Sequence, residues 1–181
     1  MTTWRTRGLR GSDLEDLITT TIEYYRQQKL GRVDKIATPV KVIDIDGNGT
    51  ITKGFFEKKS TVDFMGIMQG IGIAFDAKET AQKSLPLSNI HDHQVEFMHD
   101  IVDQKGLAFI IAHFKHCDCY HLIPYEVLVK YVTIAQQGGR KSIPFKDLDP
   151  DFEIKMATNG ILNFLPVLNT YLNKKRSGAF D

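Results

Sequence analysis

The sequence predicts an α/β fold in which helices cover the faces of a mixed β-sheet. Segments with the apolar spacing of amphipathic helices alternate with short runs rich in β-branched and apolar residues. Their order is helix, strands, helix, two strands and helix, which suits a layered mixed sheet. At 181 residues the chain is long enough for a substantial core, and we expect a single domain over residues 1–181.

The first half of the chain is expected to hold one helix, a short strand and two hairpins. Residues 1–11, with Arg5, Arg7 and Arg10 beside two glycines, indicate a basic flexible arm. The elements that follow are a helix from Ser12 to about Lys29, a strand at 33–36, a hairpin of strands at 40–45 and 50–56, and a hairpin of strands at 64–69 and 71–78. Thr38-Pro39 ends the first strand, and Asp46-Gly47-Asn48-Gly49 has the composition of a hairpin turn.

The second half is expected to alternate helices with a pair of strands. The elements are a helix at 90–104 capped by Ser88 or Asn89, strands at 107–114 and 119–123, a helix from Pro124 to about Gln136, and a last helix at 161–174. Pro166 is placed to shift the start of the last helix. The run Gly138-Gly139-Arg140-Lys141 is expected to form an exposed basic loop.

Composition excludes a few classes of protein. No apolar run is long enough to span a bilayer, and the N-terminus lacks an apolar signal core, so we expect neither membrane insertion nor secretion. Cys117 and Cys119 are too close together for an ordinary bridge within a strand, which favours a reducing cytoplasm. The formal net charge of +1 does not indicate whether the protein binds nucleic acid. In a DNA-cutting enzyme, acidic residues at the active site and basic residues around it cancel in the net charge.

One acidic motif stands out. Asp63 precedes an apolar strand, and the next strand carries Asp76 and Lys78, two residues apart. Side chains alternate across a strand, so Asp76 and Lys78 must point to the same face. Two carboxylates beside an ammonium suit a divalent-metal site with a positioned cation, which is the equipment that phosphodiester hydrolysis requires.

The pattern acid-x-Lys has little specificity alone. It recurs in Glu57-x-Lys59, Asp103-x-Lys105 and Glu153-x-Lys155, where a solvated face explains it. Asp76 differs because it ends the apolar run 71–75, so the pair lies at the mouth of a buried strand. Asp63, across the hairpin, can reach the same edge.

Longer matches to a known family run through the chain in order. They are Arg10-Gly11, Glu15, Glu23-Tyr24-Tyr25, Thr38-Pro39-Val40, Ser60-Thr61-x-Asp63, Gly66, Gly70, Phe75-x-Ala77-Lys78-Glu79-Thr80, Pro86-Leu87-x-Asn89, His91-x-His93-Gln94 and Gly138-Gly139-Arg140-Lys141-Ser142-Ile143. Together they resemble the RecU family, the Holliday-junction resolvases of Gram-positive bacteria and their phages. The resemblance implies the PD-(D/E)xK restriction-endonuclease-like fold, with a β-hairpin stalk at 40–56.

The resemblance also implies an activity and its residues. It implies metal-dependent cutting of four-way DNA junctions, with Asp63 and Asp76 binding Mg²⁺ or Mn²⁺ and Lys78 as the catalytic lysine. Glu15 and Gln94 would assist this site. The stalk would enter the junction centre, and the expected phosphate contacts are Arg5, Arg7, Arg10, Lys41, Lys53, Lys58, Lys59, Arg140 and Lys141.

Partners and location follow from the same resemblance. Two symmetric cuts call for a two-fold homodimer. Branched DNA is the expected substrate, a recombinase or a branch-migration helicase is a further expected partner, and the expected location is the nucleoid in the cytoplasm.

Three positions depart from the family pattern. Val62 stands where threonine is usual, Asp76 where glutamate is usual, and Ala74 where an acid is frequent. These departures leave two alternatives open: a junction-binding recombination factor with weak or lost nuclease activity, and another DNA nuclease on the same fold.

Other residues permit competing interpretations. The run from Asp44 to Gly49 resembles the start of a calcium loop, but Phe55 stands at the twelfth position, so a hairpin turn is favoured. A zinc site from His113, His116, Cys117, Cys119 and His121 lacks the paired spacing of structural sites, and a turn between 114 and 119 is favoured. Ser12-x-x-Glu15 is also a capping box, and Gln94 could be a satisfied polar residue.

Overall fold

The computed structural model describes residues 13–56 and 61–180. Its helices are α1 (Asp13–Gln27), α2 (Asp92–Asp103), α3 (Tyr125–Gln136) and α4 (Leu165–Arg176), with single 3₁₀ turns η1 (Leu87–Asn89), η2 (Phe145–Asp147) and η3 (Pro150–Phe152). Its strands are β1 (Gly31–Lys35), β2 (Val40–Ile45), β3 (Ile51–Phe56), β4 (Phe64–Met68), β5 (Ile71–Thr80), β6 (Ser84–Pro86), β7 (Leu107–Phe114), β8 (Cys119–Pro124), β9 (Ser142–Pro144) and β10 (Glu153–Ile154).

A six-stranded mixed sheet forms the centre, in the order β1-β4-β5-β7-β8-β10. Strands β5 and β7 run parallel because α2 connects them as a crossover, and the other neighbours are antiparallel. The small β6–β9 pair is separate from this sheet. The predicted mixed sheet with helices on its faces is therefore confirmed.

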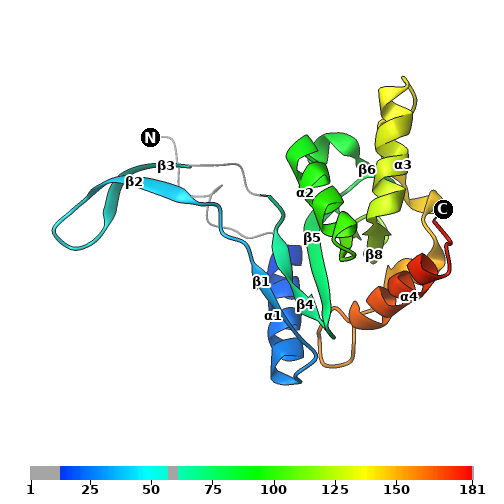
Figure 1. Cartoon of the computed structure of the whole chain (residues 1–181), viewed down its shortest axis with the longest axis horizontal. Helices are drawn as coiled ribbons and strands as arrows, with labels where there is room; N and C mark the ends of the chain where they lie inside the picture. Colours follow the sequence, from blue (N-terminus) through cyan, green and yellow to red (C-terminus); the bar gives the residue numbers. More distant parts are fainter. Residues whose placement is uncertain (1–12, 57–60, 181) are drawn as a thin grey trace.

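Each face of the sheet has its own apolar core, since inward positions alternate along the strands. On one face, β5 contributes Ile73, Phe75 and Ala77 to a core that α1 and α4 cover. The Phe75 ring stacks between Phe64 and Phe109, with ring centroids 5.0 and 4.8 Å away. The other face packs under α2 and α3. In Figure 1, α2 and α3 lie in the upper part of the view, and α1 and α4 lie in the lower part.

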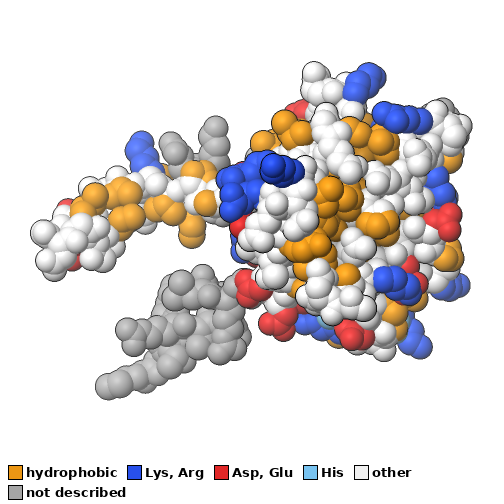
Figure 2. Space-filling view, turned by 90° about the horizontal axis from the view of Figure 1, so that it is seen from below, with side chains coloured by type: hydrophobic (Ala, Val, Ile, Leu, Met, Phe, Trp, Pro, Cys, Tyr) orange, Lys and Arg blue, Asp and Glu red, His pale blue; other side chains and the backbone are white. Residues whose placement is uncertain are grey.

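The β2–β3 hairpin projects from this body (Figure 1). Every residue of both strands is exposed, although the sequence is apolar. Figure 2 shows hydrophobic side chains along the hairpin, and the large ones are Val40, Val42, Ile43, Ile45, Ile51, Phe55 and Phe56. A two-stranded hairpin with this much exposed apolar surface marks an interaction element.

Most predicted elements agree with the structure to within a few residues, and two boundaries were wrong. Helix α2 begins at Asp92 with His91 as its N-cap, because the proposed cap residues Ser88 and Asn89 form the turn η1 instead. Helix α4 begins at Leu165, since Pro166 occupies its first turn. The sequence did not predict the short strands β6, β9 and β10, because a strand of two or three residues is too short to show an alternating pattern.

In the described part of the chain, every helix is too short or too polar to cross a lipid bilayer.

Gly66 lies opposite Val33 where β4 pairs with β1. A Cβ at Gly66 would overlap the Arg32 carbonyl oxygen and the Val33 Cα, which are main-chain atoms that cannot turn aside. We predict that Gly66→Ala lowers the free energy of unfolding by about 1–3 kcal/mol. Urea denaturation measures this change. Gly72→Ala is the matched control, because nothing lies within 4 Å of its added Cβ. Equal stabilities of the two variants would contradict the prediction.

Candidate active site

The β4–β5 hairpin brings the two predicted acids side by side. Asp63 immediately precedes β4, and the pairing of Phe64 with Phe75 places Asp63 beside Asp76. The Asp63 N–H donates to Asp76 Oδ1 at 2.9 Å, and the Ala77 N–H donates to Asp63 Oδ2 at 2.9 Å. Each carboxylate is thus held by the main chain of the opposite strand. The convergence predicted for these acids is present.

Asp76 is fully buried on the α2–α3 face of the sheet. Its neighbour across the ladder is Ile110, and Ala74 and Ala112 lie on the same face. Burial in this apolar setting disfavours the charged carboxylate and raises the pKa of Asp76 to about 6. The Lys78 ammonium opposes this rise in pKa, and the Asp63 carboxylate adds to it.

Lys78 points to the same face as Asp76, as the strand alternation predicted. Its Nζ lies 3.3 Å from Asp76 Oδ2, and only 16% of its side chain is exposed. Among the described residues, Oδ2 receives no hydrogen bond. One buried carboxylate oxygen therefore has free electron pairs beside a positioned cation.

A second ion pair borders Asp63 from the neighbouring strand. Lys35 ends β1, and the next residue, Ile36, donates its N–H to the Asp63 carbonyl at 2.8 Å. Lys35 Nζ lies 2.8 Å from Glu15 Oε2. Glu15 raises the pKa of Lys35 most, and Asp16 and Asp63 contribute to the same rise. Glu15 is therefore linked to the Asp63 side of the site through Lys35, and a part for Glu15 in catalysis stays a prediction.

Sequence reasoning missed Lys35. Nothing in its immediate sequence distinguishes it from other exposed lysines, because its relevance arises from the pairing of β1 with β4.

Gln94 has a structural role. Its side chain is buried, and its Oε1 accepts a hydrogen bond from the His91 N–H at 3.0 Å, which caps the start of α2. This bond directs its carbonyl oxygen toward the main chain of its own helix start. A part for Gln94 in catalysis stays a prediction.

The predicted phosphate contacts fall into separate groups. Arg5, Arg7, Arg10, Lys58 and Lys59 lie outside the described residues, as do the basic arm at 1–11 and the cap residue Ser12. Lys41 and Lys53 are exposed on the hairpin, while Arg140 and Lys141 are exposed in the loop after α3. The hairpin and α3 lie far apart in Figure 1.

The structure favours turns over the calcium and zinc sites considered above. Asp46 Oδ1 accepts the N–H groups of Asn48 and Thr50 at 2.9 and 2.8 Å, so this run is a hairpin turn. Residues 115–118 form the turn that was favoured over a zinc site. The described residues contain no group of three or more His, Cys, Asp and Glu side chains suited to a metal ion.

The raised pKa of Asp76 predicts a distinctive pH dependence for Asp76→Asn. Between pH 3.8 and about 6, native Asp76 keeps a proton that the unfolded chain has lost, so stability falls as pH rises through this window. The total loss is about 3 kcal/mol, and asparagine abolishes it. Urea denaturation of the two metal-free proteins from pH 4 to 7 measures the difference. Parallel stability curves would refute the prediction.

Comparison of the sequence with known proteins identifies a family. The family model described as "Recombination protein U" matches residues 9–170. A protein of Listeria monocytogenes serotype 4a (strain HCC23), named Holliday junction resolvase RecU, is 36% identical over 166 residues, which cover 88% of this chain and 83% of the relative.

Relatives from other genera agree. The protein of the same name from Oceanobacillus iheyensis is 38% identical over 141 residues, covering 75% of this chain and 72% of the relative. That from Lactococcus lactis subsp. lactis is 34% identical over 169 residues, covering 90% and 78%. The resemblance seen in the motifs is confirmed over most of the chain, and the chain belongs to the RecU family.

Proposed function

We propose that this protein is an endonuclease that cuts four-way DNA junctions by metal-dependent phosphodiester hydrolysis during recombination and repair. The observation that carries the proposal is the cluster at the open end of the β4–β5 hairpin, where Asp63 bonds to Asp76 and Asp76 pairs with Lys78. The names of the relatives, Holliday junction resolvase, support the choice of substrate.

The donor set fits Mg²⁺ or Mn²⁺. Mg²⁺ prefers oxygen ligands, and it typically takes one or two carboxylates and completes its shell with water and substrate phosphate. Asp76 Oδ2 is a buried oxygen that accepts no hydrogen bond within the described residues, and the Asp63 carboxylate is close enough to raise the pKa of Asp76. When bound, such an ion would neutralise charge on the phosphate and lower the pKa of a water molecule.

The residues of the site would have separate roles in the reaction. The main-chain bonds to Asp63 and Asp76 fix both carboxylates before substrate arrives, which avoids reorganisation during the reaction. Lys78 would orient the attacking water or stabilise the charge that develops on the phosphate. Lys35, held by Glu15, would place a second cation on the Asp63 side.

The departures from the family pattern leave the two carboxylates and the lysine of the site in place. Val62 is fully buried in the core under α2 and α3, and Ala74 is buried on the same face. Asp76 retains the required charge with a side chain one methylene shorter than glutamate. Nothing in the described residues favours a binding factor without nuclease activity.

The proposed action on junctions extends to the assembly and its place in the cell. The exposed apolar hairpin would enter the centre of the junction, with Lys41 and Lys53 near phosphates. Two symmetric cuts require a two-fold homodimer. We propose a location on the nucleoid in the bacterial cytoplasm, where a recombinase or a branch-migration helicase would act on the same DNA.

Lys78→Ala tests the nuclease. Because the lysine acts beside the buried acid, we predict a fall in the cleavage rate of a synthetic four-way junction on the order of 100-fold or more, with junction binding retained. The matched control is Lys155→Ala, since Lys155 lies in another acid-x-Lys pattern but is 74% exposed. Single-turnover cleavage in Mg²⁺ and in Mn²⁺ measures both variants. Undiminished cleavage by Lys78→Ala would overturn the assignment.

Shortening the hairpin tests substrate selection. Residues 42–54 are replaced by an Asn-Gly turn that joins Lys41 to Phe55, its paired partner. We predict an unchanged melting temperature, because the removed strand residues are exposed. Preference for four-way over linear DNA should fall about tenfold or more in competition binding at fixed salt. Retained preference would contradict a role for the hairpin in junction recognition.

A further inference from the structure

The two cysteines of the chain lie together at the tip of the β7–β8 hairpin. Strand β7 ends at Phe114, its partner β8 begins at Cys119, and residues 115–118 form the turn between them. Cys117 is exposed in this turn, and Cys119 is half-buried. Because Cys117 belongs to a turn, the extended geometry that argues against a bridge within a strand does not apply to it.

The turn holds the two thiols close to one another. The Cys117 thiol donates to the Phe114 carbonyl oxygen at 3.5 Å, and the Cys119 thiol donates to the Cys117 carbonyl oxygen at 3.2 Å. Asp118, between them, has a left-handed backbone with a φ of 50°, which bends the chain at this residue. A hydrogen bond with the Cys117 side chain is the largest cause that raises the pKa of Cys119 to about 11, so the two side chains meet.

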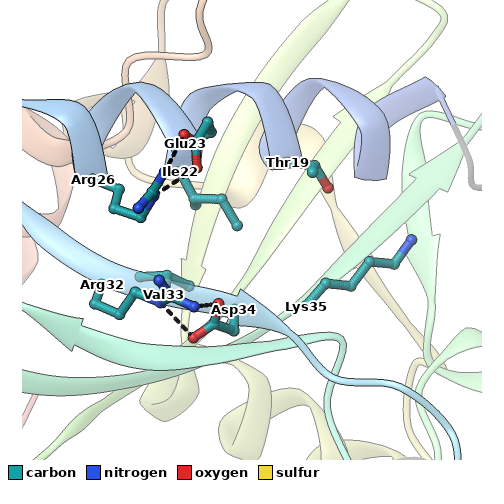
Figure 3. Close-up of a pocket in the computed structure, with 8 residues that line it drawn as sticks. All are labelled: Thr19, Ile22, Glu23, Arg26, Arg32, Val33, Asp34 and Lys35. Atoms are coloured by element: carbon teal, nitrogen blue, oxygen red, sulfur yellow. Dashed lines mark hydrogen bonds and ion pairs between the residues drawn. The ribbon is translucent and has the colours of Figure 1, made fainter.

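Polar clusters elsewhere on the surface are ion pairs. In the groove between α1 and β1, Glu23 pairs with Arg26, and Arg32 pairs with Asp34 (Figure 3). An ion pair offers no bond to form. Two adjacent thiols differ, because a covalent bond can join them and a reductant can separate them again.

We propose that Cys117 and Cys119 are a reversible redox pair, which a hydroperoxide converts to a disulfide. This modification site goes beyond the proposed function and does not depend on it. The sequence holds two cysteines, so a bridge within one chain must join them. A disulfide across one intervening residue closes a small ring, and strained or exposed disulfides are the readily reduced ones that serve regulation.

Exposure and acidity assign the order of the two steps. The Cys117 thiolate attacks the peroxide: a sulfur–oxygen bond forms, the oxygen–oxygen bond breaks, and the leaving alkoxide or hydroxide takes a proton from water. The Cys117 sulfur, oxidised by two electrons, is now a sulfenic acid. Cys119 then attacks this sulfur: the disulfide bond forms, the sulfur–oxygen bond breaks, and the departing hydroxide takes the Cys119 proton and leaves as water. Cys119 suits the second step, because its half-buried position and raised pKa leave little thiolate for the first.

The disulfide would act on a chain of polar contacts that reaches β5. Asp118 would lie inside the ring, and its Oδ1 is 2.8 Å from His113 Nε2. His113 Nδ1 is in turn 3.5 Å from Glu79 Oε1, and Glu79 directly follows Lys78 on β5. Closing the ring constrains the backbone at Asp118, so we expect oxidation to alter its contact with His113.

Intact-mass spectrometry after treatment with hydrogen peroxide tests the pair without DNA. The wild type should lose the mass of two hydrogen atoms, form no cross-link between chains, and regain its mass with dithiothreitol. Cys119→Ser should instead gain one oxygen atom at Cys117, which dimedone traps as a sulfenic acid. Cys117→Ser should react about tenfold or more slowly than Cys119→Ser, because its remaining thiol is half-buried and mostly protonated.

The wild-type result decides the proposal even where a variant does not fold, and circular dichroism checks the folding of each variant. Absence of the mass loss, a bridge between chains in its place, or equal rates for two folded single variants would each overturn the redox pair.

Nuclear magnetic resonance tests whether the change reaches the polar contacts. The imidazole signal of His113, identified by its loss in His113→Gln, should shift on oxidation and return on reduction. His99 is the matched control, since it also pairs with an aspartate, Asp103, but lies on α2. A His113 signal that stays in place, or a His99 signal that moves as far, would contradict the link to Asp118.

Discussion

The reciprocal main-chain bonds between the Asp63 and Asp76 segments are the constraint on which this molecule depends. Each acid accepts an N–H from the strand that carries the other, so the hairpin register and the carboxylate geometry are one feature. A slip of one residue in β4–β5 would send Asp76 and Lys78 to the α1–α4 face and move Phe75 out of its ring stack to the α2–α3 face. Folding and assembly of the site are therefore the same event.

This arrangement has an energetic cost. A carboxylate buried against Ile110 and alanines holds its proton to about pH 6, so the metal-free protein is destabilised when Asp76 is charged. The surrounding core offsets the cost, because apolar side chains pack both faces of the strand that carries the acid. A divalent cation would relieve the same penalty, which links metal affinity to the instability of the metal-free protein.

The two apolar hairpins show that tertiary context decides which apolar strands are buried. The β4–β5 hairpin lies within the sheet and buries most of β5, whereas the β2–β3 hairpin is exposed along its whole length. The strands of the projecting hairpin are the richer in β-branched and aromatic residues, with 8 of 12 residues against 6 of 15 in β4 and β5. The difference lies in the covering helices: α1 and α2 pack on β5, and the described helices leave the projecting hairpin bare. Exposed apolar area at Phe55 and Phe56 is thus available for a partner.

Local sequence determined the elements and the pairing of acid with amine, since alternation alone places Asp76 and Lys78 on one face and apolar runs mark the buried strands. It also indicated the family, because the motifs keep their order. Tertiary structure decided the rest. Glu15 and Lys35, twenty residues apart in number, meet each other only because α1 packs beside β1, and they lie near Asp63 because β1 pairs with β4. The start of α2 at Asp92 depended on the turn η1, and the raised pKa of Asp76 depended on neighbours from β7. Contacts between distant segments carry no periodic signal, so sequence patterns predict the elements but not the environments that these contacts create.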